Sequence, residues 1–215
     1  MKRCLSFLAV LLLAAGGSPA HDMVQPDWRG GGEGITFQQW TFSDASNPAQ
    51  PDVSVNPYGQ AEAAINVGLM GEGWLESLGF DSQTGMWDIG GPDGSITLAI
   101  DNRPLELPYK EIWLQVTYYE LMGNLPSIDV PGAQFISGQT ITIEEDPILA
   151  GTGWFLDQSV WRIEPNPSSE QIILTGADMG STIDQIVVDT ICIPEPCTAI
   201  LLLTGTWIGL RKRLK

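Results

Sequence analysis

The stretch SITLAIDNRPLELPYKEIWLQVTYY, residues 95–119, decides the fold class of this chain. In its first seven residues Ile96, Leu98 and Ile100 alternate with smaller or polar residues, the period-two pattern of a half-buried strand. The segment NRPLELP then interrupts any regular structure, because proline removes a backbone donor and restricts its neighbour. The last nine residues are rich in β-branched and aromatic side chains, which favour a second strand.

Similar segments recur along the chain, separated by glycine- and proline-rich breakers at intervals of roughly 8–15 residues. The further predicted strands are 35–42, 61–68, 85–90, 133–138, 139–145, 159–165, 170–176 and 182–190. A helix at 71–78 is the one helical alternative, but it is short and broken by glycine. The pattern therefore predicts an all-β fold, a single antiparallel jelly-roll-like β-sandwich over residues 33–191.

The segment 182–190, TIDQIVVDT, departs from strict alternation. Ile183 is followed by Ile186 and Val188, so the apolar phase shifts by one residue within the strand. Such a shift indicates either a β-bulge or burial on both faces of the sheet.

The N-terminal end reads as an export signal. Lys2 and Arg3 precede an apolar segment that is too short to span a bilayer, and small residues lead up to Ala20. We therefore expect a signal peptide at 1–20, cleaved between Ala20 and His21, and a flexible lead-in at 21–32. A buried N-terminal helix is the alternative.

The charge of the chain is very unevenly distributed. Residues 21–193 hold four Lys and Arg side chains against 25 Asp and Glu, a formal net charge of −21. A field of this sign repels phosphate backbones, so it argues against a nucleic-acid partner. It also favours solubility and attracts divalent cations. After signal cleavage only Cys192 and Cys197 remain, so the domain must depend on a hydrophobic core rather than on disulfides.

The C-terminal tail, residues 192–215, has three parts in a fixed order. Pro194, Glu195 and Pro196 come first, and the two prolines prevent a helix from crossing the motif. Cys197 to Leu210 follows without a charge, and its 14 residues would make a helix of about 21 Å, against about 30 Å of hydrocarbon. Arg211, Lys212 and Arg213 then place the end of the chain on the cytoplasmic side.

This order resembles the PEP-CTERM sorting tail, over residues 194–215 only. The resemblance implies recognition by an exosortase, a membrane peptidase of exopolysaccharide-producing bacteria. It also implies transient anchoring of the C-terminal transmembrane helix, cleavage near the motif, and release to the cell surface or extracellular matrix. An ordinary tail anchor is the alternative.

Catalytic patterns are sparse. His21 is the single histidine, at the expected new N-terminus, so Ser-His-Asp and Cys-His sites and His-rich zinc sites are not expected inside the fold. Paired carboxylates are the remaining option, with Asp88 and Glu164 beside tryptophans as candidates. We therefore expect a non-enzymatic surface protein, with a carboxylate-dependent glycan-active enzyme as the alternative.

Two binding hypotheses follow from residue type. Glu144, Glu145 and Asp146 close a predicted strand with hard oxygen ligands, which suit a structural calcium ion. A purely structural, calcium-stabilised surface module is therefore a further alternative. Trp74 and Trp154, in the glycine-rich contexts GEGWLES and GTGWFLD, are expected at loop edges, where their rings could stack on exopolysaccharide.

Overall fold

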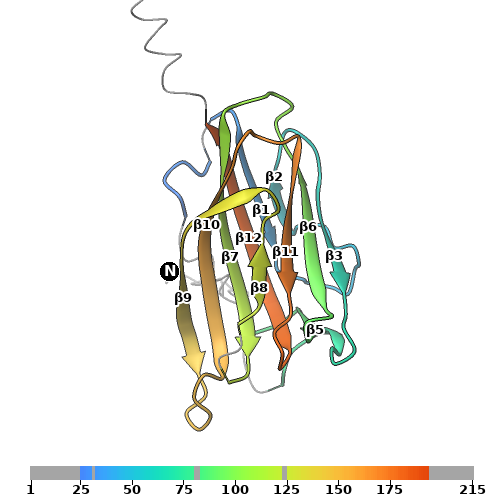
Figure 1. Cartoon of the computed structure of the whole chain (residues 1–215). Coiled ribbons are helices and arrows are strands. Elements are labelled where there is room, and N and C mark those ends of the chain that lie inside the picture. The colour runs from blue at the N-terminus through green and yellow to red at the C-terminus, as the bar shows by residue number, and fades with distance from the viewer. Residues whose placement is uncertain (1–24, 31, 80–82, 123–124, 194–215) are drawn as a thin grey trace, which may run out of the picture.

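A computed structural model of the chain describes residues 25–30, 32–79, 83–122 and 125–193. In these residues every regular element is a strand (Figure 1). The first six strands are β1 (Ile35–Trp40), β2 (Val53–Val55), β3 (Ala61–Asn66), β4 (Gly73–Leu75), β5 (Met86–Gly90) and β6 (Ser95–Asp101). The others are β7 (Tyr109–Glu120), β8 (Ser127–Asp129), β9 (Ala133–Glu145), β10 (Gly153–Ile163), β11 (Ser169–Thr175) and β12 (Ser181–Ile193).

The strands form two antiparallel sheets. The large sheet has eight strands, in the order β2-β1-β12-β7-β10-β9, with β5 paired to β12 and β4 paired to β5. The small sheet has four strands in the order β3-β6-β11-β8. In Figure 1, β9 and β10 extend past β8, the edge strand of the small sheet. The architecture is therefore all-β with two antiparallel sheets, consistent with a sandwich.

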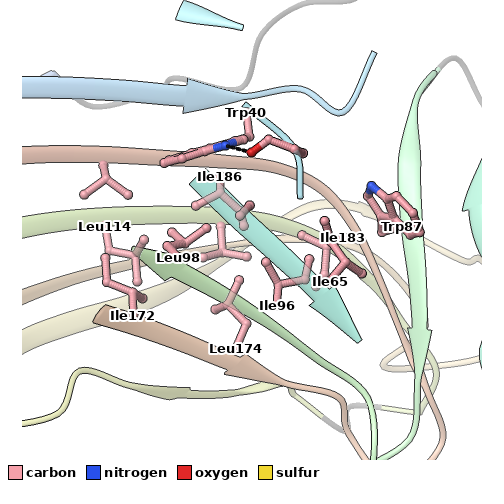
Figure 2. Close-up of a cluster of buried hydrophobic side chains, with 14 of the residues drawn as sticks. Trp40, Ile65, Trp87, Ile96, Leu98, Leu114, Ile172, Leu174, Ile183 and Ile186 are labelled. Atoms are coloured by element: carbon pink, nitrogen blue, oxygen red, sulfur yellow. Dashed lines mark hydrogen bonds between the residues drawn. The ribbon is translucent and has the colours of Figure 1, made fainter. Parts of the chain in front are cut away.

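The core lies between the two sheets (Figure 2). Leu98 on β6, Leu114 on β7 and Ile186 on β12 are at most 1 % exposed. The Trp40 indole is fully buried there, and its N–H donates a hydrogen bond of 3.2 Å to the Ala49 carbonyl. A buried indole needs such a partner, because an unpaired donor inside a core costs free energy. Both sheets and this whole core lie between residues 35 and 193.

The strand β12 is central in the large sheet and is buried on both faces over Ser181–Thr190. Its pairing with β7 shifts register between Ile183 and Gln185, so Asp184 is the extra residue of a bulge. Ile183 and Ile186 both belong to the core cluster, because the bulge realigns the apolar phase. Both interpretations of the broken alternation are therefore confirmed.

Seven of the predicted segments, counting 95–101 and 111–119, match single strands with small differences at their ends. The segments 133–138 and 139–145 form one continuous strand, β9, because Gly138 does not interrupt the pairing with β10. The prediction for 159–165 begins six residues late, since β10 starts at Gly153. The helical alternative at 71–78 is wrong, because Gly73–Leu75 pairs with β5 as β4.

The expected signal peptide, its cleavage between Ala20 and His21, and residues 194–215 of the sorting tail lie outside the described residues, whereas Cys192 and Ile193, expected in the tail, belong to β12. Within the described ranges, no helix is long and apolar enough to cross a membrane. The described chain ends at Ile193, the last residue of β12, and the next residue in the sequence is Pro194.

Candidate functional site: a groove on the outer face of the large sheet

The register of β7, β10 and β9 brings six side chains together on the face of the large sheet that points away from the core. Ile112 and Leu114 face the core. Because side chains alternate along a strand, Trp113 and Gln115 point outward. Two rows then cross the three strands, with residues directly opposite one another in each row. The rows are Trp113, Val160 and Ser137, and Gln115, Gln158 and Gln139.

These rows line a groove of about 330 Å³, which we call the Trp113 groove. Besides the six side chains, Leu114, Gly138 and Ser159 complete its lining. The volume is at the lower end of the range of small-molecule pockets in proteins, so the groove suits a short stretch of a polymer. Ser137 and Gln139 are exposed, and Gln115 is 6 % exposed, so one end of the groove is open and the other is deep.

The three glutamines form a hydrogen-bonded row along the floor. The Gln139 amide donates from Nε2 to Gln158 Oε1 at 2.8 Å, and Gln158 Nε2 donates to Gln115 Oε1 at 3.5 Å. The Gln139 and Gln158 amides each have two donor hydrogens and an oxygen with two lone pairs, more than these contacts use. These two side chains can therefore hold their own geometry and still offer donors and acceptors to a ligand.

Trp113 is fixed at the other side of the groove by two contacts. Its indole N–H donates to Glu111 Oε1 at 3.3 Å, and its ring meets Trp28 edge-on, with centroids 6.2 Å apart and planes at 85°. These contacts hold the ring in one orientation, which reduces the entropy that a ligand must offset on binding.

Trp28 belongs to the segment at 25–30, which precedes β1 and is attached to the large sheet through Arg29. Its neighbour Arg29 pairs with Asp189 of β12, with Nε 2.6 Å from Oδ1, and lies 4.4 Å over the Phe37 ring. Asp189 is directly opposite Trp113 in the register of the large sheet. The segment at 25–30 thus lies on the same outer face as the groove and supports its tryptophan.

The chemistry of the lining is neutral throughout: one indole, three amides, a hydroxyl and aliphatic or backbone groups. An aromatic face next to a row of hydrogen-bonding amides provides the two contacts that a sugar ring uses, its apolar C–H face and its hydroxyl edge.

The two tryptophans predicted to contact glycan lie outside the groove, each within one residue of a strand end, as expected for loop edges. Trp74 is half-buried in β4, where its indole N–H donates to the Phe42 carbonyl at 2.8 Å. Trp154 is in β10, 2 % exposed, with its ring 5.4 Å from Tyr119. Their glycine-rich flanks mark strand ends, and there Trp74 is half-buried while Trp154 is almost fully buried.

The acidic cluster predicted to bind calcium closes the turn between β9 and β10. Asp146 Oδ1 accepts hydrogen bonds from the Ile148 and Leu149 amides at 2.8 and 2.9 Å, and these bonds lower the pKa of Asp146. Glu145 Oε1 accepts from the Gly151 amide at 3.1 Å, while Glu144 is exposed. No three acidic, histidine or cysteine side chains among the described residues gather as a metal site, so the calcium hypothesis gains no support.

The carboxylates considered for catalysis do not meet in the structure. Asp88 accepts from the Gly90 and Glu72 amides and pairs in register with Thr182, near the start of β12. Glu164 follows the other end of the large sheet, with its Oε1 3.9 Å from Arg162. The two therefore lie at opposite ends of the same sheet.

Two carboxylates with raised pKa values lie on the inner face of the large sheet, opposite the groove. Burial raises the pKa of Glu120 to about 7, and it also raises the pKa of Asp157. Asp157 is directly opposite Val116, and Val116 is four residues before Glu120 on β7. The rise per residue of a strand therefore separates the backbones of Asp157 and Glu120 by roughly 13 Å. Paired carboxylates of glycosidases are about 5–9.5 Å apart.

No protein-family model, curated protein or solved structure matches this chain. The assignment of the groove as a candidate site therefore depends on its geometry alone. The sequence held one signal for them: in EIWLQV, Trp113 and Gln115 are out of phase with the apolar positions of the strand. That signal separates Trp113 from the core, but it cannot show which residues of β9 and β10 lie beside it.

Proposed function

We propose that this chain is an exported, non-enzymatic surface or matrix protein that binds polysaccharide in the Trp113 groove. The observation that carries the proposal is the pair of rows across β7, β10 and β9, which set an oriented indole beside three amides. The proposed scaffold is a jelly-roll-like form of the two-sheet sandwich.

The way in which the groove is built supports a binding role. Trp113 and the glutamines are on strands of the large sheet, and rigid strands position side chains better than loops do. The Trp113 ring offers its face to the C–H groups of a sugar ring, while Gln139 and Gln158 reach its hydroxyls. Because the amides already contact one another, they need little rearrangement to bind.

Sorting by an exosortase-type membrane peptidase is the second part of the proposal. The contacts at the end of β12 support this part of the proposal. The Cys192 amide donates to the Gly34 carbonyl at 2.9 Å, and its buried sulfur lies 3.4 and 3.2 Å from Asn102 Oδ1 and Asn166 Oδ1. The Pro-Glu-Pro motif therefore begins two residues after a firmly held position, and its cleavage would release the whole domain.

Affinity electrophoresis tests the binding role. Residues 21–193, which contain both sheets and every residue of the described core cluster, are run through gels containing single polysaccharides. We expect retardation on at least one polymer, and a Trp113→Ala change should weaken it at least tenfold, about 1.4 kcal/mol. Trp161→Phe is the matched control, because Trp161 lies on the inner face beside Phe135. Retention on no polymer, or equal retention of the Trp113 variant, overturns the proposal.

Processing of the full chain in its native host tests the sorting role. Replacing Pro194 or Glu195 by Ala should leave the uncut precursor in the membrane fraction. Thr204→Ser, outside the motif, is the control and should be processed normally. Normal processing of both motif variants contradicts the sorting role and leaves the binding role standing.

A further inference from the structure

We infer that the polysaccharide bound in the Trp113 groove is neutral, a chain of sugars without carboxylate, sulfate or phosphate groups. The inference rests on the proposed binding function and narrows its ligand to one chemical class. Three separate observations support it: the lining, the pairing of the cations and the overall field.

The lining of the groove contains no group that could neutralise a negative charge. Gln115, Gln139 and Gln158 contribute amides, Ser137 a hydroxyl, and Trp113 an aromatic face. An anionic sugar entering such a groove would lose part of its hydration and gain neutral hydrogen bonds in return. Burying a charge without a counter-charge is unfavourable, so the groove selects against it.

The cations of the described residues are already paired with carboxylates. Arg162 is one of two cations near the groove, together with Arg29, and lies in the next row of the outer face, directly opposite Glu111 and Gln134. Its guanidinium lies 3.7 Å from Glu111, 3.9 Å from Glu164 and 4.4 Å from the Tyr109 ring centre. The Glu111 and Glu164 carboxylates and the Arg162 guanidinium together carry a net formal charge of −1 at this rim of the groove.

The other three cations lie in ion pairs of their own. Arg29 pairs with Asp189, Arg103 with Glu33, and Lys110 with Glu170. Lys110 and Glu170 are both fully buried, so that lysine cannot reach a surface ligand. A carboxylated or sulfated chain would therefore compete with carboxylates of the protein for each cation in the described part of the molecule.

The field of the whole domain acts in the same direction. With a net charge of −21 over residues 21–193, the domain repels any polymer that carries a negative charge on each repeat. At physiological ionic strength the screening length is about 8 Å, so charges at the rim of the groove still act on a bound chain. A neutral chain feels none of this repulsion, and its binding should not depend on salt.

Matched polymers that share a backbone test the inference. Hydroxyethyl cellulose is compared with carboxymethyl cellulose, and dextran with dextran sulfate, using residues 21–193 at 20 and 500 mM NaCl. We expect at least one neutral member to be retained tenfold more strongly than its charged partner at low salt. Its retention should change less than twofold between the two salt concentrations.

Each outcome separates the inference from the function on which it rests. Equal or stronger retention by a charged partner at low salt, abolished by Trp113→Ala, overturns the inference but leaves the proposed function intact. Retention on no polymer of either kind overturns both.

Substitutions at Gln139 provide an independent readout. Gln139 is exposed at the open end of the groove, so changing it should not disturb the core. Gln139→Glu keeps the shape but replaces the amide donor to Gln158 Oε1 by a second acceptor, so it should weaken retention on the neutral polymer. Gln139→Lys should raise retention on the charged partner at least threefold at 20 mM NaCl. If the lysine variant shows no gain, charge does not decide selection at this groove, and the inference fails.

Discussion

Burial of Glu120 makes the stability of the domain depend on pH. Glu120 is the last residue of β7 and is fully buried on the inner face of the large sheet. Its Oε1 accepts a hydrogen bond from the Ser181 hydroxyl at 2.6 Å, while Oε2 has no partner. Loss of hydration raises the pKa of this carboxyl from 4.5 to about 7, because the charged form is disfavoured inside the protein.

The sign and size of the effect follow from proton linkage. An acid whose folded pKa is raised stabilises the fold fully below its unfolded pKa, and this stabilisation is lost as the pH rises through the folded pKa. The difference between 4.5 and about 7 corresponds to about 3 kcal/mol in full, at 1.36 kcal/mol per pH unit. Of this, roughly 2.5 kcal/mol should be lost between pH 5 and pH 8.

Urea unfolding of residues 21–193 at pH 5 and pH 8 measures the effect, with Glu120→Gln as the test and Glu144→Gln as the control. Glu144 is exposed on β9, so its replacement should leave the pH dependence unchanged. The Glu120→Gln side chain has no charge to bury and keeps an oxygen for Ser181, so this variant should lose about 2.5 kcal/mol less stability than the wild type over the same interval. If the Glu120→Gln variant and the wild type lose the same stability, the reasoning about Glu120 is refuted.

Three further predictions concern the core and the buried polar groups. Leu98→Ala should lower the free energy of unfolding by about 2–5 kcal/mol, since Leu98 is fully buried between the sheets, and a loss below about 1 kcal/mol in urea melts would contradict the core assignment. Lys110→Met should cost about 3–5 kcal/mol because it leaves the Glu170 carboxylate unpaired, whereas the double variant with Glu170→Leu should recover most of that loss in the same assay. The Cys192 thiol, whose pKa is raised by burial, should react with a thiol reagent in residues 21–193 only after urea is added, and rapid labelling of the native protein would show that this end of β12 is open.

The sequence predicted strands well where side chains alternate over enough residues. Ile96, Leu98 and Ile100 define β6 with its observed ends, because one face of that strand is core and the other is not. Alternation cannot reveal β4 or β8, since each has only three residues and neither completes a periodic pattern.

The candidate site could not be predicted from the sequence, for a different reason. Trp113 could be separated from the core by its phase, but Val160 and Ser137 are brought beside it by register, which depends on how two other strands pair. Trp154 lies at the edge of a turn, where Gly151 and Gly153, both with positive φ, lead into β10, but the composition of that turn could not show that its side chain is buried. Local composition thus identified turns, while only the pairing of strands assembled the groove.

The most direct test of the account is nuclear magnetic resonance of residues 21–193 during titration with fragments of the best-retained neutral polymer. The indole N–H of Trp113 and the side-chain amides of Gln139 and Gln158 should shift first and saturate together, because all three line one groove. Shifts that begin at Trp161 and Phe135 on the inner face, with Trp113 and the glutamines unchanged, would contradict the central claim.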